Sequence, residues 1–392
     1  MKSQFTILLY RNKREDIKME LIFHKSEEYI DEDIFYYISD QRDKHSMIKP
    51  KKENLISMTV DSEKLLPPSK NEITNVFYPF KKNSIDKIYI GLSFPLFSNN
   101  WAASYLRYLL KVIKKENGSI ILPVYPEEQA NEKGMWSRSF LENIFTSRTG
   151  WTGKNNVWAE NDGVMSMRIG KKFPKKPDST LNFYLDEIGN QFYRNQLNGG
   201  NKENKETIKN IWLTSKYSSI IEKVIQDKFQ KDNIVYADIC DDSSLAFEVS
   251  VSDYISVKKT IICTDDDSLY DDLLNYFSYR SKNDFTLLSK SKLQALDKYQ
   301  PNVVSIINNK NNDEYLEAIT KLLPKTNIIF YGTFSENSEK FSASYDISIY
   351  STIVASKLET GKTINHYSDI IEEKINLEKD NSLAKMYLLT PK

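Results

Sequence analysis

The feature that most constrains the fold is the regular alternation of short apolar runs with amphipathic stretches. The run Lys87–Leu92 is followed by Trp101–Lys115, where apolar residues recur at helical spacing: Leu106, Leu109, Leu110 and Ile113. Asn117 and Gly118 then form a helix stop of the kind that a left-handed C-cap needs, and Ser119–Val124 is the next buried run. Strand, helix, glycine turn and strand together predict a βαβ unit of a parallel sheet.

The rest of the first half extends this pattern. A charged, Tyr- and Phe-containing stretch, Lys25–His45, predicts a helix with a solvated face, and Met135–Phe145 predicts another helix. A hairpin is predicted where Asn161-Asp162-Gly163 joins two apolar runs. The strands expected in this half are Thr6–Tyr10, Met19–Phe23, Leu55–Val60, Ile73–Phe77, Lys87–Leu92, Ser119–Val124, Val157–Glu160 and Val164–Ile169.

The segment Lys171–Ser179 contains Pro174 and Pro177 among lysines and is the predicted domain boundary. It divides the chain into domains of residues 1–175 and 176–392. The 392 residues suit two or three domains at roughly 100–200 residues each.

The second half again alternates apolar runs with helical stretches. A polar, Gly-containing loop is expected at Asn198–Asn204. The helices expected are Leu181–Leu197, Ile208–Phe229, Leu269–Tyr279 and Tyr315–Leu323, and the strands are Asn233–Ile239, Lys258–Cys263, Phe285–Leu288, Val303–Ile307, Asn327–Tyr331, Ile347–Ile353, Ile375–Leu377 and Met386–Leu389. The predicted fold class is therefore α/β, with two Rossmann-like, doubly wound domains.

Charge and composition narrow the choice of partners. Lys+Arg and Asp+Glu both number 54, so the net charge of zero does not favour nucleic acid, and it eases self-association into a homodimer or a complex with a partner protein. The sequence contains no run of about 20 apolar residues, so no membrane span is predicted. A cytoplasmic location is the default expectation. Cys240 and Cys263 lie in apolar runs, which indicates buried free thiols, and no cluster of Cys and His residues has the spacing of a zinc site.

One block of the first half carries a family resemblance. Within Ile73–Glu127, a turn containing Tyr78-Pro79-Phe80, Ser84 and Asp86 leads into one strand, and Leu110-Lys111 through Gly118 leads into the next. This block resembles the fourth and fifth strands of the class I, S-adenosylmethionine-dependent methyltransferases. The resemblance implies that fold, and S-adenosylmethionine as the cofactor.

A second, weaker resemblance lies in the other half. The strand Ile234–Ile239 ends near Asp238, Asp241 and Asp242, and Thr260–Cys263 ends at Asp265-Asp266-Asp267. In the family, an acidic residue that closes the second strand accepts hydrogen bonds from the ribose. By resemblance, Asp265 takes that role and Asp238 faces the methionine amino group. The cofactor-contacting candidates are Asp238, Asp241, Asp265, Asp266 and Asn308.

Other interpretations of these residues stay open. The family places a glycine loop after its first strand, whereas this chain has Cys240-Asp241-Asp242-Ser243-Ser244, and no glycine loop precedes Leu55. The chain is therefore either a methyltransferase, active or degenerate and in tandem, or a non-catalytic scaffold or complex subunit built of pseudo-methyltransferase domains. A third alternative is a nucleotide-sugar glycosyltransferase in which Asp265 and Asp267 bind a divalent metal. Asp265–Asp267 also suits a solvated turn that caps the following helix, and Asn308 and Asn309 suit an ordinary turn.

The substrate candidates lie in the first half: Ser93, Asn99, Trp136 and Arg138. Ser93 and Asn99 follow the strand Lys87–Leu92, at the edge where parallel sheets bind ligands. Trp136 and Arg138 belong to an aromatic-basic group with Arg148, Trp151 and Trp158, which suits core packing or an interface as well as a substrate pocket. The sequence assigns no catalytic residue, and it leaves open whether the chain is an enzyme.

Overall fold

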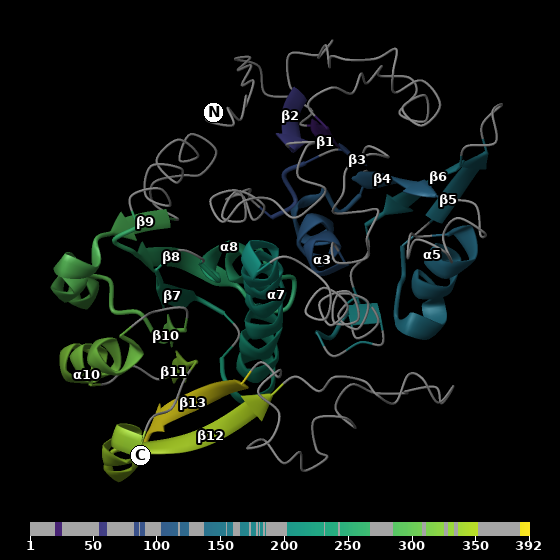
Figure 1. Ribbon diagram of the computed structural model, residues 1–392. Coiled ribbons are helices and arrows are strands. Elements are labelled where there is room, and N and C mark those ends of the chain that lie inside the picture. Colours follow the sequence, from purple (N-terminus) through teal and green to yellow (C-terminus); the bar gives the residue numbers. More distant parts are fainter. Residues whose placement is uncertain are drawn as a thin grey trace. The chain divides into compact units, whose positions relative to one another are not determined.

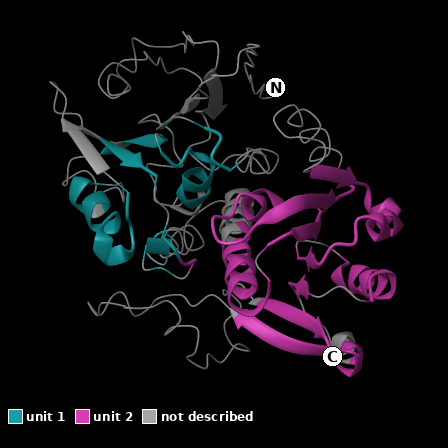
Figure 2. Cartoon of the chain, turned by 180° about the vertical axis from the view of Figure 1, so that it is seen from behind, with its two compact units in different colours: residues 1–69, 82–175, 179–209 teal, residues 70–81, 176–178, 210–392 magenta. Residues whose placement is uncertain are grey.

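The computed structural model consists of two compact units, each built on its own sheet (Figure 1). One unit comprises residues 1–69, 82–175 and 179–209, and the other residues 70–81, 176–178 and 210–392 (Figure 2). The structure describes residues 20–25, 55–60, 82–85, 87–90, 103–116, 118–124, 137–153, 155–159, 165–171, 174–177, 179, 181–182, 185, 202–230, 232–241, 244–266, 285–307, 311–324, 328–332, 336–351 and 385–392.

The N-terminal unit has a six-stranded mixed sheet in the order β2-β1-β3-β4-β6-β5. Strands β2, β1, β3 and β4 are parallel neighbours, and β6 runs antiparallel to both β4 and β5. The strands are β1 (Glu20–Lys25), β2 (Leu55–Val60), β3 (Lys87–Ile90), β4 (Ser119–Val124), β5 (Asn155–Ala159) and β6 (Met165–Gly170).

Two helices of this unit match the expected ones, α3 (Ala103–Val112) and α5 (Arg138–Ile144). The left-handed C-cap predicted at Gly118 is wrong. Among the described residues, Gly150 is the glycine with a left-handed backbone. A Cβ on Gly118 would instead lie 2.2 Å from the carbonyl oxygen of Lys114. Glycine is therefore needed there for close backbone approach.

The C-terminal unit has a seven-stranded sheet in the order β12-β13-β11-β10-β7-β8-β9. The five strands β11, β10, β7, β8 and β9 are parallel, and β13 runs antiparallel between β11 and β12. The strands are β7 (Ile234–Ile239), β8 (Val257–Cys263), β9 (Phe285–Leu288), β10 (Val303–Ile306), β11 (Ile328–Tyr331), β12 (Tyr345–Ser351) and β13 (Lys385–Pro391).

The helices of this unit are α7 (Lys202–Lys228), α8 (Ala246–Ser250) and α10 (Asn312–Leu322), with 3-10 helices at Lys290–Lys298 and Glu336–Ala343. Leu296, Leu316 and Ile319 pack on one face of the sheet, in a cluster with Ala237, Ile239 and their neighbours on β8, β10 and β11. Because strand side chains alternate between faces, Tyr236 and Asp238 lie on the opposite face. This is a methyltransferase-like Rossmann fold in which β7 is the first strand and β13 lies antiparallel between β11 and the edge strand β12.

Most expected elements of both units are confirmed, to within a few residues at their ends. The loop expected at Asn198–Asn204 is wrong at its end, because α7 already begins at Lys202. The expected strands Thr6–Tyr10, Ile73–Phe77 and Ile375–Leu377, the helix Leu269–Tyr279, residues 26–45, and most of Leu181–Leu197 lie outside the described residues. Among the described residues, no helix is long and apolar enough to cross a membrane.

Candidate functional site

The sheet of the C-terminal unit fixes where a ligand can bind. The chain runs outward from β7 through β8 to β9 and then returns to β10 on the other side of β7. Segments that follow β7 and β10 therefore leave toward opposite sides, and the carboxyl ends of such strands are where open α/β sheets are expected to bind ligands. Asp238, Asp241, Asp265 and Asp266 all lie at this edge, and Asn308 lies outside the described residues.

Asp238, near the end of β7, is buried, and its carboxyl accepts hydrogen bonds from three residues of the same unit. Its Oδ2 accepts hydrogen bonds from Ser244 Oγ at 2.6 Å and the Leu245 amide at 2.7 Å, and its Oδ1 accepts one from Ser305 Oγ at 2.5 Å. Ser305 lies opposite Asp238 on β10 and also shares a hydrogen bond of 2.6 Å with the Tyr236 hydroxyl. The carboxylate thus ties the loop after β7 to β10, which makes Asp238 a positioning residue. Its predicted contact with a methionine amino group stays a prediction.

Burial raises the pKa of Asp238 above 3.8, while hydrogen bonds from Ser244, Ser305 and backbone amides act in the opposite direction. Burial also raises the pKa of the Cys240 and Cys263 thiols, which are free and buried as predicted. Thiols held protonated in this way are poor nucleophiles, so neither cysteine is a candidate for covalent chemistry.

The raised pKa of Asp238 predicts a specific pH dependence of stability. The fold favours the protonated carboxyl, so its contribution is fully present below pH 3.8 and is lost as pH rises through the folded-state pKa. The free energy of unfolding of the wild type, relative to the non-titrating Asp238→Asn variant, should therefore fall as the pH is raised from about 4 upward. Urea unfolding of both proteins across this range measures the difference. A difference that stays constant with pH would contradict the assignment.

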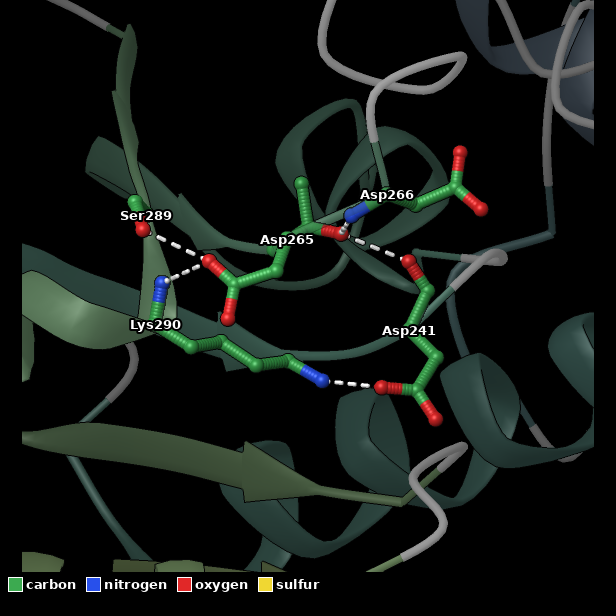
Figure 3. Close-up of polar contacts among 6 residues, drawn as sticks. Asp241, Asp265, Asp266, Ser289 and Lys290 are labelled. Carbon is green, nitrogen blue, oxygen red and sulfur yellow. Dashed lines mark hydrogen bonds and ion pairs between the residues drawn. The ribbon is translucent and has the colours of Figure 1, made fainter.

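Asp265 follows β8 and is exposed, but its orientation is fixed (Figure 3). Its Oδ1 accepts hydrogen bonds from Ser289 Oγ at 2.6 Å and from the Lys290 amide at 2.8 Å, both directly after β9. Among the described residues, Oδ2 of Asp265 has no hydrogen-bond partner. A carboxylate held through one oxygen, with the other oxygen open, is suited to accept from a ligand hydroxyl.

Asp241 and Lys290 form an ion pair that links the ends of β7 and β9. The Lys290 side chain is buried, and its ammonium lies 4.8 Å from the centre of the Tyr315 ring on α10, within the range of a cation–π interaction. Thr264, between them at the end of β8, donates to the Asp241 carbonyl at 2.6 Å and accepts from the Asp266 amide at 3.1 Å. The sequence did not single out Lys290, Ser289 or Thr264.

The binding of a divalent metal by Asp265 and Asp267 stays a prediction. Asp267 lies outside the described residues, and Asp265 is hydrogen bonded to Ser289 and Lys290. Across the part of the chain that the structure describes, no three His, Cys, Asp or Glu side chains are grouped so as to hold a metal ion.

The substrate candidates of the N-terminal unit are only partly described. Arg138 is exposed and pairs with Glu142 in the next turn of α5, while Ser93, Asn99 and Trp136 lie outside the described residues. Trp151 is buried, with its ring 5.1 Å from that of Phe145 in an edge-on contact, so it serves the core. The grouping of the four substrate candidates therefore stays a prediction.

No protein-family model and no curated protein matches this chain. Solved structures similar to it include precorrin-6y C5,15-methyltransferase from Geobacter metallireducens, at 13% identity and a TM-score of 0.28, covering 44% of this chain and 88% of that one. Another is precorrin 8W decarboxylase from Methanobacterium thermoautotrophicum (11% identity, TM-score 0.27, 44% and 89% covered).

A third is phosphoethanolamine N-methyltransferase 1 from Haemonchus contortus, solved with phosphoethanolamine and S-adenosylhomocysteine (9% identity, TM-score 0.26, 96% and 88% covered). Such low identities and TM-scores assign no activity to this chain. The assignment of a methyltransferase-like fold rests on the strand order of the C-terminal unit.

Proposed function

We propose that the C-terminal unit is a methyltransferase-like domain that binds the adenosine portion of S-adenosylmethionine at the carboxyl ends of β7 and β8. The observation that carries this proposal is Asp265. It closes the second strand of the fold, it is held through Oδ1 by Ser289 and Lys290, and its Oδ2 faces no partner among the described residues. A ribose hydroxyl is the group that this oxygen accepts from.

The residues at this edge of the sheet suit the adenosine end of the cofactor better than its methionine end. At the adenosine end, Asp265 offers a preorganised acceptor. At the methionine end, the amides of Leu245 and Ala246 already donate to Asp238 and to Ser244, respectively. When bound, S-adenosylmethionine supplies an electrophilic methyl group. The role of this chain's residues is to bind the nucleoside and, through Asp238, to hold the loop beneath it.

The strand orders support a tandem arrangement as part of the proposal. With β3 to β6 of the N-terminal unit taken as the fourth to seventh strands, its order becomes 2-1-4-5-7-6. The C-terminal unit, numbered from β7, has the order 3-2-1-4-5-7-6 when read from β9. Among the described strands, the two sheets thus differ only in the third strand, at one edge. We propose that both units derive from the methyltransferase fold, with the boundary near residues 171–179.

A second candidate function is a non-catalytic scaffold or complex subunit. The Asp241–Lys290 pair favours it, because a charged pair lies where the ligand crevice is expected. The homodimer or protein partner expected from the neutral charge belongs to this candidate and stays a prediction. Light scattering at micromolar concentration measures it.

Titration calorimetry on the full chain separates the candidates. We expect S-adenosylhomocysteine and S-adenosylmethionine to bind at one site per chain, and UDP-sugars with manganese to give no heat. Binding of UDP-sugars alone would favour the glycosyltransferase alternative. Absence of heat with every ligand, for both the wild type and the Lys290→Met variant described below, would overturn the proposal and leave the scaffold.

A further inference from the structure

The Lys290 side chain crosses the end of the strand that carries Asp265. Its backbone amide binds Asp265 Oδ1, while its ammonium reaches Asp241 in the loop after β7. Since β8 lies between β7 and β9 in the sheet, the lysine spans the carboxyl end of β8 (Figure 3). A ligand whose ribose sits on Asp265 and whose remainder extends toward β7 would meet this pair.

The pair is built to persist in the absence of a ligand. The Lys290 side chain is 4% exposed and that of Asp241 is 31% exposed, so water competes poorly for the ammonium. The Tyr315 ring lies beside the same ammonium, and the Ser289 hydroxyl and Lys290 amide anchor the base of the lysine to Asp265. A cation that is buried, paired and placed near a ring costs free energy to move.

We propose that Lys290 is a latch: its pair with Asp241 closes the crevice at the ends of β7, β8 and β9, and a nucleoside binds only when that pair is broken. This inference rests on the proposed function, since the latch regulates that same site. The latch lowers the apparent affinity by the fraction of molecules in which it is open. Removing it raises affinity without adding any contact to the ligand.

The test compares Lys290→Met with the wild type by calorimetry, with S-adenosylhomocysteine and adenosine as probes. Methionine keeps the apolar chain length but removes the charge. We expect both probes to bind about tenfold more tightly to the variant, as for an open fraction of about one tenth in the wild type. Lys298→Met is the matched control, since Lys298 is exposed on the same 3-10 helix, and it should bind as the wild type does.

The outcomes distinguish this inference from the proposed function. If Lys290→Met binds adenosine no more tightly than the wild type binds it, the latch is wrong and the nucleoside site stands. A gain for S-adenosylhomocysteine alone would also overturn the latch, because the altered charge would then act on the ligand's amino group. If neither protein binds either probe, the proposed site fails and the latch with it. Should Lys290→Met not fold, Asp241→Asn breaks the same pair and should strengthen adenosine binding likewise.

Discussion

Replacement of Asp265 by asparagine should weaken the binding of S-adenosylhomocysteine by about ten- to hundredfold. The substitution removes the charged acceptor for the ribose, and hydrogen bonds to charged groups contribute about 1.5–3 kcal/mol. About 1.4 kcal/mol corresponds to one decade in the dissociation constant. Calorimetry on the full chain measures the loss, in the Lys290→Met background if the wild type binds too weakly.

Two variants give this experiment its controls. Asp346→Asn removes an exposed carboxylate from β12, at the other edge of the same sheet, and should leave binding unchanged. Ser289→Ala keeps the Asp265 carboxylate but removes one of the two hydrogen bonds that orient it, and should cause a smaller loss. If Asp265→Asn binds as tightly as the unsubstituted protein, the placement is wrong. The N-terminal unit, with Ser93 after the strand Lys87–Ile90, then becomes the next candidate.

The substitution Asp238→Ala should lower the free energy of unfolding by about 3 kcal/mol or more. It leaves the Ser244 and Ser305 hydroxyls and the Leu245 amide without their acceptor, and each buried donor left unsatisfied costs about 1–3 kcal/mol. Urea unfolding measures the change. Asp346→Ala, on the exposed side of β12, should change the same free energy by less than about 0.5 kcal/mol. Similar stabilities of the two variants would show that Asp238 does not hold this loop.

The central strands β10 and β11 of the C-terminal sheet could be predicted because they are fully buried. Runs such as Val303–Ile306 and Ile328–Tyr331 are continuously apolar or nearly so, and each directly follows an asparagine. The short helix α8 could not be predicted, since its five residues give no helical period. The 3-10 helix Lys290–Lys298 was missed for a similar reason, as its backbone is interrupted at Lys292.

The structural role of Asp238 was not anticipated, because an acidic residue at a strand end suggests a ligand contact. One signal was present in the sequence. Ser305 is a polar residue inside the buried run Val303–Ile306, and a buried hydroxyl needs a partner. The parallel register of β7 and β10 supplies that partner, placing Ser305 opposite Asp238. Strand register depends on the whole sheet, so the pairing itself was not predictable from either segment alone.

Lys290 gave no comparable signal. A lysine after a short strand is usually solvated, and its partner Asp241 lies 49 residues earlier in the chain. The two residues meet only because β7, β8 and β9 are adjacent and parallel. Asp265, in contrast, was predicted as a ligand contact from its place after the second strand and from the family resemblance, and this role stays a prediction.

Hydrogen–deuterium exchange with and without S-adenosylhomocysteine, on the full chain carrying Lys290→Met, tests the central claim most directly. Backbone amides at the ends of β7, β8 and β9 should exchange more slowly with the ligand, above all at residues 240–246, 264–266 and 289–290. The β12–β13 edge of the same sheet should be unaffected, since it lies at the far end of the strand order. Slower exchange confined to the N-terminal unit, or the same exchange with and without the ligand, would contradict a nucleoside site at this edge.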